Sequence, residues 1–292
     1  MRGGWARILA VGLTAGLAAC GADSAAGQET LFFSAIPDQN NTELAQKFGK
    51  VAAYLTRELG VPVKYRAASD YGASVEMFKS RDIQLAWFGG LTGCQARQAV
   101  AGARAIAQGR EDPNFYSYFI AHKSTGLERS DEFPEAIREL TFTFGSETST
   151  SGRLMPEYFI KKHTGQSPRR FFAKPYGFSG SHDKTWEAVQ SGRIQAGVLN
   201  YTTYDKAVKQ GNLDPAVCKI IWKTPDYADY NFTAHPILKE RYGAGFVEKL
   251  QKALLAMRGD LLQAFPRSAL IEAKNEDFDA IAAVARNLNL LR

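Results

Sequence analysis

The stretches MFKSRDIQLAWFG (residues 77–89) and AVQSGRIQAGVLN (residues 188–200) decide the expected fold, because they follow the same pattern. Each contains the end of a helix, a basic residue, an Ile-Gln pair and a short apolar strand, in that order. Chance can produce so few matches, so we infer no internal duplication. The pattern does predict two similar α/β lobes. Open α/β sheets bind ligands beyond the carboxyl ends of their strands, so the equivalent ends, WFGG and VLNY, are expected to face a shared cleft.

Strands and helices alternate along the rest of the chain, which indicates α/β construction with short crossovers. The aromatic segments 115–122 and 220–232 bracket the second lobe and are the expected crossings between the lobes. The expected strands are 31–36, 61–68, 83–89, 141–145, 169–173 and 194–199, and the expected helices are 41–59, 73–81, 92–101, 131–140, 151–165, 181–192, 246–257 and 277–288.

The N-terminal segment predicts secretion. Arg2 and Arg7 form a basic head, and residues 8–19 are an apolar run too short to span a bilayer. The run ends in LAAC, which resembles the lipobox of bacterial lipoproteins. We therefore expect a signal peptide at 1–19, lipidation of Cys20 and a lipid-anchored tether at 20–30. The alternative is a plain signal peptide in which the cysteine is incidental.

Composition excludes several other classes of protein. Hydrophobic residues make up 45% of the chain and the formal charge is +6, which is typical of a folded domain with a mild preference for anions. The Lys and Arg residues are scattered, so we expect no nucleic-acid partner. The four His residues lack metal-ligand spacing, and no cofactor is expected. Cys94 and Cys218 fall in different lobes and are expected to be free, buried thiols.

The segment SETSTSG (146–152) leads from the expected strand 141–145 into a helix. Backbone N–H groups at a helix start lack partners and carry partial positive charge. Ser149, Thr150 and Ser151 add hydroxyl donors, so the segment is a candidate anion site without a cation. The alternative is that one of them only caps the helix. Pro156 lies past the usual first-turn position and predicts a kink or a later helix start.

The chain resembles the periplasmic phosphonate-binding proteins of ABC importers, with their phosphite- and phosphate-binding relatives. Within this family, it is most similar to the selenate-importer binding proteins. The similarity runs from Phe33 to Tyr204 and rests on four motifs in order, namely SDYGA (69–73), LAWFGGL (85–91), TSTSG (148–152) and GSHD (180–183). The resemblance implies a type II periplasmic-binding-protein clamshell with two crossover strands. We expect lobe 1 at 31–122 plus 232–292 and lobe 2 at 123–231.

The resemblance also implies a closed pocket between the lobes, with no catalytic residue and no metal. Tyr71 would donate its hydroxyl to an oxyanion, Asp183 would accept a ligand proton, and His182 would donate as a protonated imidazole. The serine-threonine nest would supply further donors from lobe 2. The implied ligand-binding residues are Tyr71, Phe88, Ser149, Thr150, Ser151, His182 and Asp183, with Gln195 and Tyr201 as secondary candidates.

Two departures from the family bear on the ligand. Phe88 stands where the family commonly has a tyrosine, and Gln195 stands at or near a family aspartate. A carboxylate only accepts hydrogen bonds, so it suits a ligand that carries a proton and repels a fully ionised dianion. An amide at that position favours a sulfate- or selenate-like ligand, whereas Asp183 favours phosphonate, phosphite or phosphate.

The implied function is binding of a small oxyanion by a monomeric, membrane-anchored protein on the periplasmic or cell-surface side. The anion would then pass to an ABC permease in the inner membrane. Two alternatives remain open. An oxyanion sensor would use the same fold with a signalling partner. A hydrolase would use serine with His182 and Asp183, but the chain has no G-x-S-x-G motif, and an adjacent His and Asp suit a catalytic triad poorly.

Overall fold

The computed structural model describes Met1 and residues 29–39 and 41–291. The predicted lipidation at Cys20, and the signal peptide apart from Met1, lie outside the described residues. Within those residues, no helix combines the length and the apolar character that a membrane span requires.

The first sheet has six strands in the order β11-β4-β10-β3-β1-β2. Strand β1 pairs in parallel with β2 and β3, whereas β10 runs antiparallel to β3 and β4. All four residues of β3 are buried, as expected for a strand covered on both faces. The strands are β1 (Leu31–Ala35), β2 (Val63–Tyr65), β3 (Leu85–Phe88), β4 (Arg104–Gly109), β10 (Asn231–Ala234) and β11 (Leu270–Glu272).

The second sheet has five strands in the order β7-β6-β8-β5-β9. These strands are β5 (Ser117–His122), β6 (Phe142–Phe144), β7 (Gly177–Phe178), β8 (Ala196–Asn200) and β9 (Cys218–Lys223). The chain enters this sheet between β4 and β5 and returns between β9 and β10. The first crossing between the lobes therefore comes before β5 and not at residue 122, where the boundary was expected, because β5 pairs with β8 and β9 of the second sheet. The predicted α/β fold with two lobes and two crossings is confirmed.

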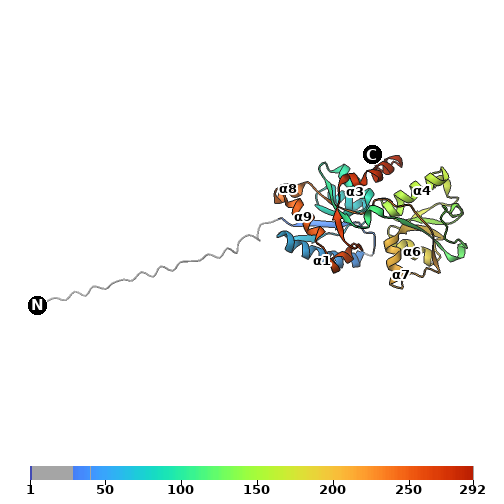
Figure 1. The fold of residues 1–292 in the computed structure, drawn as a ribbon, viewed down its shortest axis with the longest axis horizontal. Coiled ribbons are helices and arrows are strands. Elements are labelled where there is room, and N and C mark those ends of the chain that lie inside the picture. Colours follow the sequence, from blue (N-terminus) through green and yellow to red (C-terminus); the bar gives the residue numbers. More distant parts are fainter. Residues whose placement is uncertain (2–28, 40, 292) are drawn as a thin grey trace.

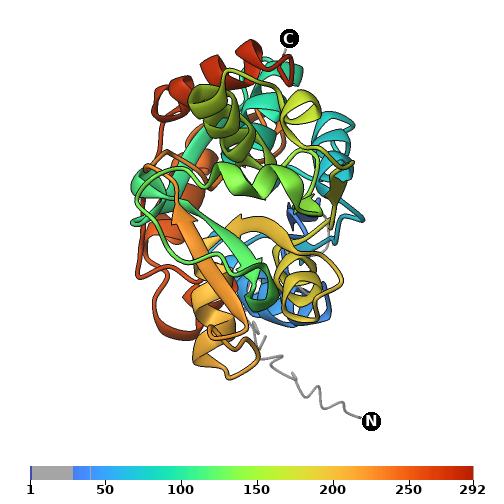
Figure 2. The same cartoon turned by 90° about the vertical axis from the view of Figure 1, so that its right-hand side faces the viewer.

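Helices cover both sheets (Figure 1). The first lobe contains α1 (Asn41–Leu59), α2 (Tyr71–Lys79), α3 (Gly90–Ala99), α8 (Ile237–Tyr242), α9 (Phe246–Leu255) and α10 (Asp279–Asn287). The second contains α4 (Met155–Thr164), α5 (Pro168–Phe171), α6 (His182–Gln190) and α7 (Tyr201–Lys209), with α4 on one side of the sheet and α6 and α7 on the other (Figures 1 and 2). Short 3-10 helices are η1 (Asp112–Asn114), η2 (Lys123–Thr125), η3 (Glu135–Glu139), η5 (Gly259–Ala264) and η6 (Asn275–Phe278), and η4 (Thr150–Leu154) is a π-helical turn.

Two expected elements are wrong. Residues 168–171 form α5 instead of the expected strand at 169–173, because Ser167 takes the N-cap position and Pro168 starts the helix with its fixed φ. The helix expected at 131–140 is reduced to η3, which begins after Pro134. Proline disfavours helical geometry in the residue before it, so the helix does not extend toward residue 131. The expectation for the cysteines is confirmed, since Cys94 and Cys218 are both free and buried.

The two crossings are bonded to each other and to an ion pair. Phe115 and Tyr227 exchange backbone hydrogen bonds of 2.9 and 2.8 Å. Beside them, Arg267 contacts Asp112 at 2.7 Å, with side-chain exposures of only 2% and 0%. The guanidinium also lies over the rings of Phe115 and Tyr230, at 5.0 and 4.8 Å from their centroids. The ion pair therefore ties the C-terminal segment of the chain to both crossings.

Removing Arg267 is expected to destabilise the protein strongly. Arg267→Met leaves Asp112 buried without its cation, and breaking a buried pair in this way costs about 3–5 kcal/mol. Urea denaturation measures the free energy of unfolding. Arg104→Met is the matched control, because its pair with Glu248 is about half exposed and contributes less than about 1 kcal/mol. Equal effects of the two substitutions would contradict a structural role for the buried pair.

Candidate functional site

Helices from both lobes begin at the boundary between the lobes. In the first lobe α2 begins at Tyr71 and α3 at Gly90, and in the second lobe η4 begins at Thr150 and α6 at His182. The contact between lobes is direct, because the Leu91 N–H donates to Thr150 Oγ1 at 2.9 Å. The first N–H groups of a helix have no intrahelical acceptor, and peptide dipoles make this end partly positive. This boundary therefore gathers helix ends that favour an anion.

The serine-threonine nest is buried, and its π-helical geometry follows from a proline. Ser149 Oγ accepts the Gly152 N–H at 2.9 Å, so Ser149 caps the start of the helix, as the alternative interpretation of this segment expected. Pro156 is the second residue of α4 and has no N–H to continue the helical ladder. The Gly152 carbonyl instead accepts the Gly145 N–H at 2.8 Å. The proline thus leaves an acceptor that ties the nest to the end of β6.

Two glycines allow the nest to pack this closely. A Cβ on Gly152 would lie 3.1 Å from the Gly145 Cα and 3.2 Å from His182 Cε1. A Cβ on Gly145 would lie 3.2 Å from the Gly152 Cα. Contacts this short are unusual for any real Cβ, so a side chain at either position would push the nest away from β6. The glycines therefore hold the nest beside His182.

Asp229 joins the nest to the first lobe. Its Oδ1 accepts the Gly90 N–H at 2.9 Å, and the hydroxyls of Thr150 and Ser151 lie close enough to this carboxylate to oppose the rise in its pKa that burial causes. Thr150 Oγ1 also accepts the Leu91 N–H, so the Thr150 hydroxyl lies at the junction between the lobes. Asp229 belongs to the second crossing and was missed in the sequence, where PDYADY offers no local pattern that marks it.

Three polar atoms at this junction are buried and have no hydrogen-bond partner among the described residues. They are the Tyr71 hydroxyl, His182 Nε2 and Asp229 Oδ2. Burial, reinforced by Asp38, raises the pKa of Tyr71 well above its ordinary value, so its hydroxyl stays protonated and can donate. Leaving a buried polar group unpaired costs about 1–3 kcal/mol. The cluster therefore fits a polar ligand enclosed between the lobes.

His182 is neutral, which corrects the expected protonated imidazole. Burial lowers its pKa to about 3. Nδ1 accepts the Asn200 backbone N–H at 3.3 Å, so the ring proton lies on Nε2, the unpartnered atom. A serine hydrolase would need a carboxylate on Nδ1, and a backbone amide is there instead. Asp183 is half-buried and accepts the Trp186 Nε1–H at 3.4 Å.

Asp38 is a second carboxylate that the sequence analysis missed. It follows β1 and accepts the Tyr230 hydroxyl at 2.9 Å. Burial raises its pKa to about 6, and burial likewise raises the pKa of Asp229 to about 6. The position of Asp38 beyond the carboxyl end of a parallel strand is a signal that could have identified it.

Three other predicted residues have partners of their own. Phe88 is fully buried and packs edge-on against Phe78, with the ring centroids 5.6 Å apart. Gln195 precedes β8 and accepts the Thr141 N–H at 3.1 Å, at the opposite end of the strand from Asn200. Tyr201 stacks on Tyr116 at a centroid distance of 4.0 Å, beside the crossings.

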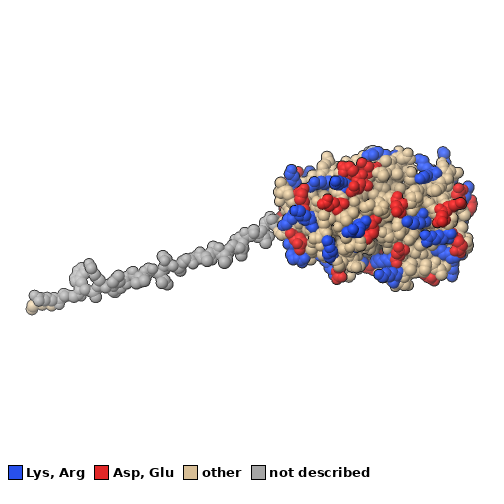
Figure 3. Space-filling view, viewed as in Figure 1, with Lys and Arg blue, Asp and Glu red and all other residues tan. Residues whose placement is uncertain are grey.

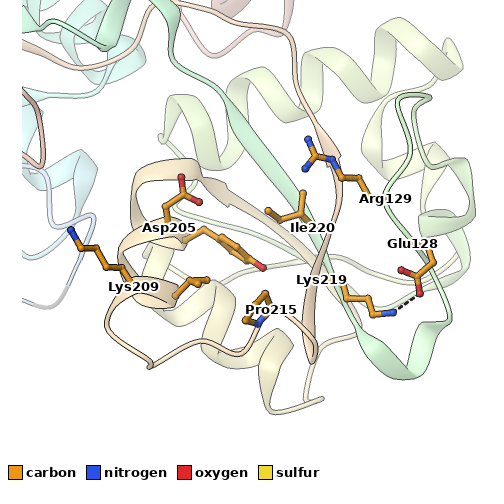
Figure 4. A pocket seen from close by; sticks show the side chains of 9 residues that line it. Glu128, Arg129, Asp205, Lys209, Pro215, Lys219 and Ile220 are labelled. Atoms are coloured by element: carbon orange, nitrogen blue, oxygen red, sulfur yellow. Dashed lines mark hydrogen bonds and ion pairs between the residues drawn. The ribbon is translucent and has the colours of Figure 1, made fainter.

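Several surface hollows lie away from the three unpartnered atoms. One hollow of about 490 Å³ is on the second lobe and is lined by residues that include Asp205, Lys209 and Ile220, with the ion pair of Lys219 and Glu128 at its edge (Figure 4). Charges of both signs are mixed over the face seen in Figure 3, with no large patch of one sign. No group of three metal-ligating side chains occurs in the described part of the chain. The buried junction is therefore the candidate functional site.

Comparisons with known proteins agree on one family. A family model described as "ABC transporter, phosphonate, periplasmic substrate-binding protein" matches residues 33–278. The "Probable ABC transporter phosphite binding protein PhnD1" of Prochlorococcus marinus is 36% identical over 90% of this chain and 91% of its own length. The phosphate-import protein PhnD of Mycolicibacterium smegmatis is 29% identical, over 76% of this chain and 70% of that relative.

Solved structures show the same fold. The structure of PhnD1 from Prochlorococcus marinus in complex with methylphosphonate has a TM-score of 0.85 and covers 90% of this chain and 99% of that one, at 36% identity. A binding protein of an ABC phosphonate transporter from Pseudomonas aeruginosa has a TM-score of 0.76 at 19% identity, over 88% and 86% of the two chains. The chain therefore belongs to the family of periplasmic phosphonate-binding proteins of ABC transporters, whose members are substrate-binding transport components and not enzymes.

Proposed function

We propose that this protein is an extracytoplasmic lipoprotein that binds a small, proton-bearing tetrahedral oxyanion between its lobes and delivers it to an ABC importer. The observation that carries the proposal is a set of three buried polar atoms beside the nest that have no hydrogen-bond partner among the described residues, namely the Tyr71 hydroxyl, His182 Nε2 and Asp229 Oδ2. The lipobox-like LAAC before Cys20 supports the lipid anchor.

The chemistry of these atoms selects the class of ligand. Tyr71 and the neutral His182 donate hydrogen bonds, and the start of η4 adds the backbone N–H groups of Thr150 and Ser151. Asp229 Oδ2 can only accept when it is ionised, so it suits a ligand that carries a proton. Phosphite, phosphate and phosphonate monoanions carry one near neutral pH. The names of the relatives and the methylphosphonate complex of PhnD1 support the same class.

Sulfate and selenate are weaker candidates on this geometry. The preference for them rested on Gln195, and that side chain bonds to Thr141 at the far end of β8. A fully ionised dianion would instead meet the buried carboxylate of Asp229, with that of Asp38 nearby. These carboxylates favour a protonated oxyanion over a dianion of the same shape.

Binding by uncharged donors suits capture followed by release. The two donor side chains identified here, those of Tyr71 and His182, are uncharged. The nearby Arg267 is already paired with Asp112. We infer that closure of the lobes assembles the donors around the anion and that opening at the crossings releases it to the permease.

Tyr71→Phe tests the site directly. The hydroxyl has no hydrogen-bond partner among the described residues, so its loss is not expected to destabilise the ligand-free protein. Affinity for methylphosphonate or phosphite, measured by isothermal titration calorimetry, is expected to fall about tenfold or more. Tyr54→Phe is the matched control, because the Tyr54 hydroxyl donates to the Ala253 carbonyl on the outer face of lobe 1. Binding of none of the tested oxyanions by the unmodified protein would refute the proposed function.

Asp229→Asn is expected to change selectivity. The amide keeps an oxygen for the Gly90 N–H but removes the negative charge beside the ligand. The ratio of phosphite affinity to sulfate or selenate affinity should fall about tenfold, since the dianion no longer meets a buried carboxylate. Asp226→Asn, on the same crossing but about half exposed and paired with Lys223, is the control. An unchanged ratio in Asp229→Asn would show that this carboxylate does not distinguish a protonated oxyanion from a dianion.

The neutral state of His182 predicts an acid dependence of stability. Its pKa is about 3 in the folded protein and about 6.5 when unfolded, so the unfolded state gains the proton first. Stability is therefore lost as the pH falls from about 6.5 toward 3. His182→Gln should show a smaller drop in melting temperature between pH 7 and pH 5 than the unmodified protein.

The comparison between variants isolates His182, because the buried carboxyls titrate alike in both proteins. His122→Gln, at the outer end of β5, serves as the control and should retain the drop of the unmodified protein. Nitrogen-15 NMR should also show His182 protonated on Nε2 alone at pH 6–8. A proton on both ring nitrogens at pH 6 would contradict the assignment.

A further inference from the structure

We propose that Asp38, Tyr230 and Asn200 are positioning residues, which form a closed hydrogen-bonded ring with His182 and hold its Nε2–H toward the ligand only when the lobes are together. This inference rests on the proposed function, because it concerns how the same site is assembled.

Four contacts make up the ring. The Tyr230 hydroxyl donates to Asp38 Oδ2 at 2.9 Å and accepts from Asn200 Nδ2 at 2.9 Å. The Asn200 backbone N–H donates to His182 Nδ1 at 3.3 Å. The His182 backbone N–H donates to the Asp38 carbonyl at 3.1 Å and closes the ring. All four residues are buried.

The donors and acceptors of the ring allow one arrangement of protons. The amide of Asn200 can only donate from Nδ2, so the Tyr230 oxygen accepts there and turns its own proton toward Asp38. Asn200 Oδ1 is used separately, because it accepts the Thr203 N–H at 2.7 Å and caps α7. At the last link, the backbone donor places the lone pair of His182 on Nδ1. This link selects the imidazole tautomer that donates from Nε2, and the other three links hold Asn200 and the His182 backbone relative to Asp38.

The hydrogen-bonded ring includes residues of both lobes and of the second crossing, which come together when the lobes close. Asp38 follows β1 in the first lobe, Tyr230 lies on the second crossing, and Asn200 and His182 belong to the second lobe. Two of the four contacts, Tyr230 to Asp38 and His182 to Asp38, link the first lobe to the rest. Opening of the lobes would break them. The ring thus couples closure to the orientation of a ligand donor.

Tyr230 is held firmly enough to serve as the centre of the ring. Its side chain stacks on Trp87, with centroids 5.5 Å apart and an interplanar angle of 21°. Arg267 lies over the same ring at 4.8 Å. These contacts involve the aromatic face and leave the hydroxyl free to bond at the ring edge. Tyr230→Phe therefore removes the hydrogen bonds and retains the packing.

The experiment compares four forms of the full-length protein with methylphosphonate and phosphite as probes. Tyr230→Phe breaks the ring at its centre. Asn200→Asp keeps an oxygen for the cap of α7 and removes the donor to Tyr230. Tyr204→Phe is the matched control, since its buried hydroxyl donates to the Cys218 carbonyl within the second lobe. Stopped-flow fluorescence gives the association and dissociation rates, and melting temperatures are recorded with and without ligand.

We expect both ring variants to bind about tenfold or more weakly, mainly through faster dissociation. Their ligand-free melting temperatures should match that of the unmodified protein, because the ring is not formed when the lobes are open. Nitrogen-15 NMR of ligand-bound Tyr230→Phe should show a changed His182 Nε2 shift with its proton retained, because the Asn200 backbone N–H still occupies Nδ1.

Two outcomes would overturn the inference alone. One is binding by both ring variants that matches Tyr204→Phe, and the other is a loss of ligand-free stability that accounts for the whole loss of affinity. Failure of the unmodified protein to bind either probe would overturn the proposed function, and the inference with it.

Discussion

The N-terminal ends of helices, which carry partial positive charge, face one another across the boundary between the lobes. The arrangement of the candidate site follows from this constraint. The start of α3 lies against the start of η4, so two partly positive ends are buried together. Asp229 neutralises the first of them by accepting the Gly90 N–H. The second retains backbone donors that a small anion can satisfy. An anion between the lobes would therefore supply the negative charge that favours closure, which links binding to conformation without any charged side chain from the nest.

Some residues at this boundary connect the two lobes, and others have polar atoms that are left to bind the ligand. The Thr150 hydroxyl accepts the Leu91 N–H from the other lobe, so its side chain connects the two lobes. Tyr71 and His182 keep an unpartnered atom each and can face the ligand. A buried polar atom is costly when it is left unpaired, so these donors act as a penalty on closure around an empty site. The unpartnered donors thus favour the closed form only when a ligand accepts their hydrogen bonds.

Much of the fold was predictable, because local patterns decide it. Amphipathic periodicity located α1, and serine and threonine after a strand located the nest. Tyr71 and His182 were named through the motifs that carry the family resemblance, and both begin helices at the boundary between the lobes. Asp38, Asn200 and Asp229 were missed because their importance arises from contacts between lobes, such as the bond from Tyr230 to Asp38 over a separation of 192 residues. Gln195 was named because the resemblance placed it at or near a family aspartate, and the contact that the structure gives its side chain oxygen is with Thr141.

The placement of Arg267 explains how a chain with a formal charge of +6 can bind an anion without a free cation at the site. Its guanidinium is close enough to lower the pKa of Asp38 and of Asp229, yet its direct bonds go to Asp112 and to backbone carbonyls. The charge therefore helps to keep the two acidic acceptors ionised while its own donors are occupied. An ionised carboxylate beside neutral donors favours an anion that carries a proton over one that carries none. A free guanidinium would attract both. Selectivity in this site thus depends on a cation that is present but already paired.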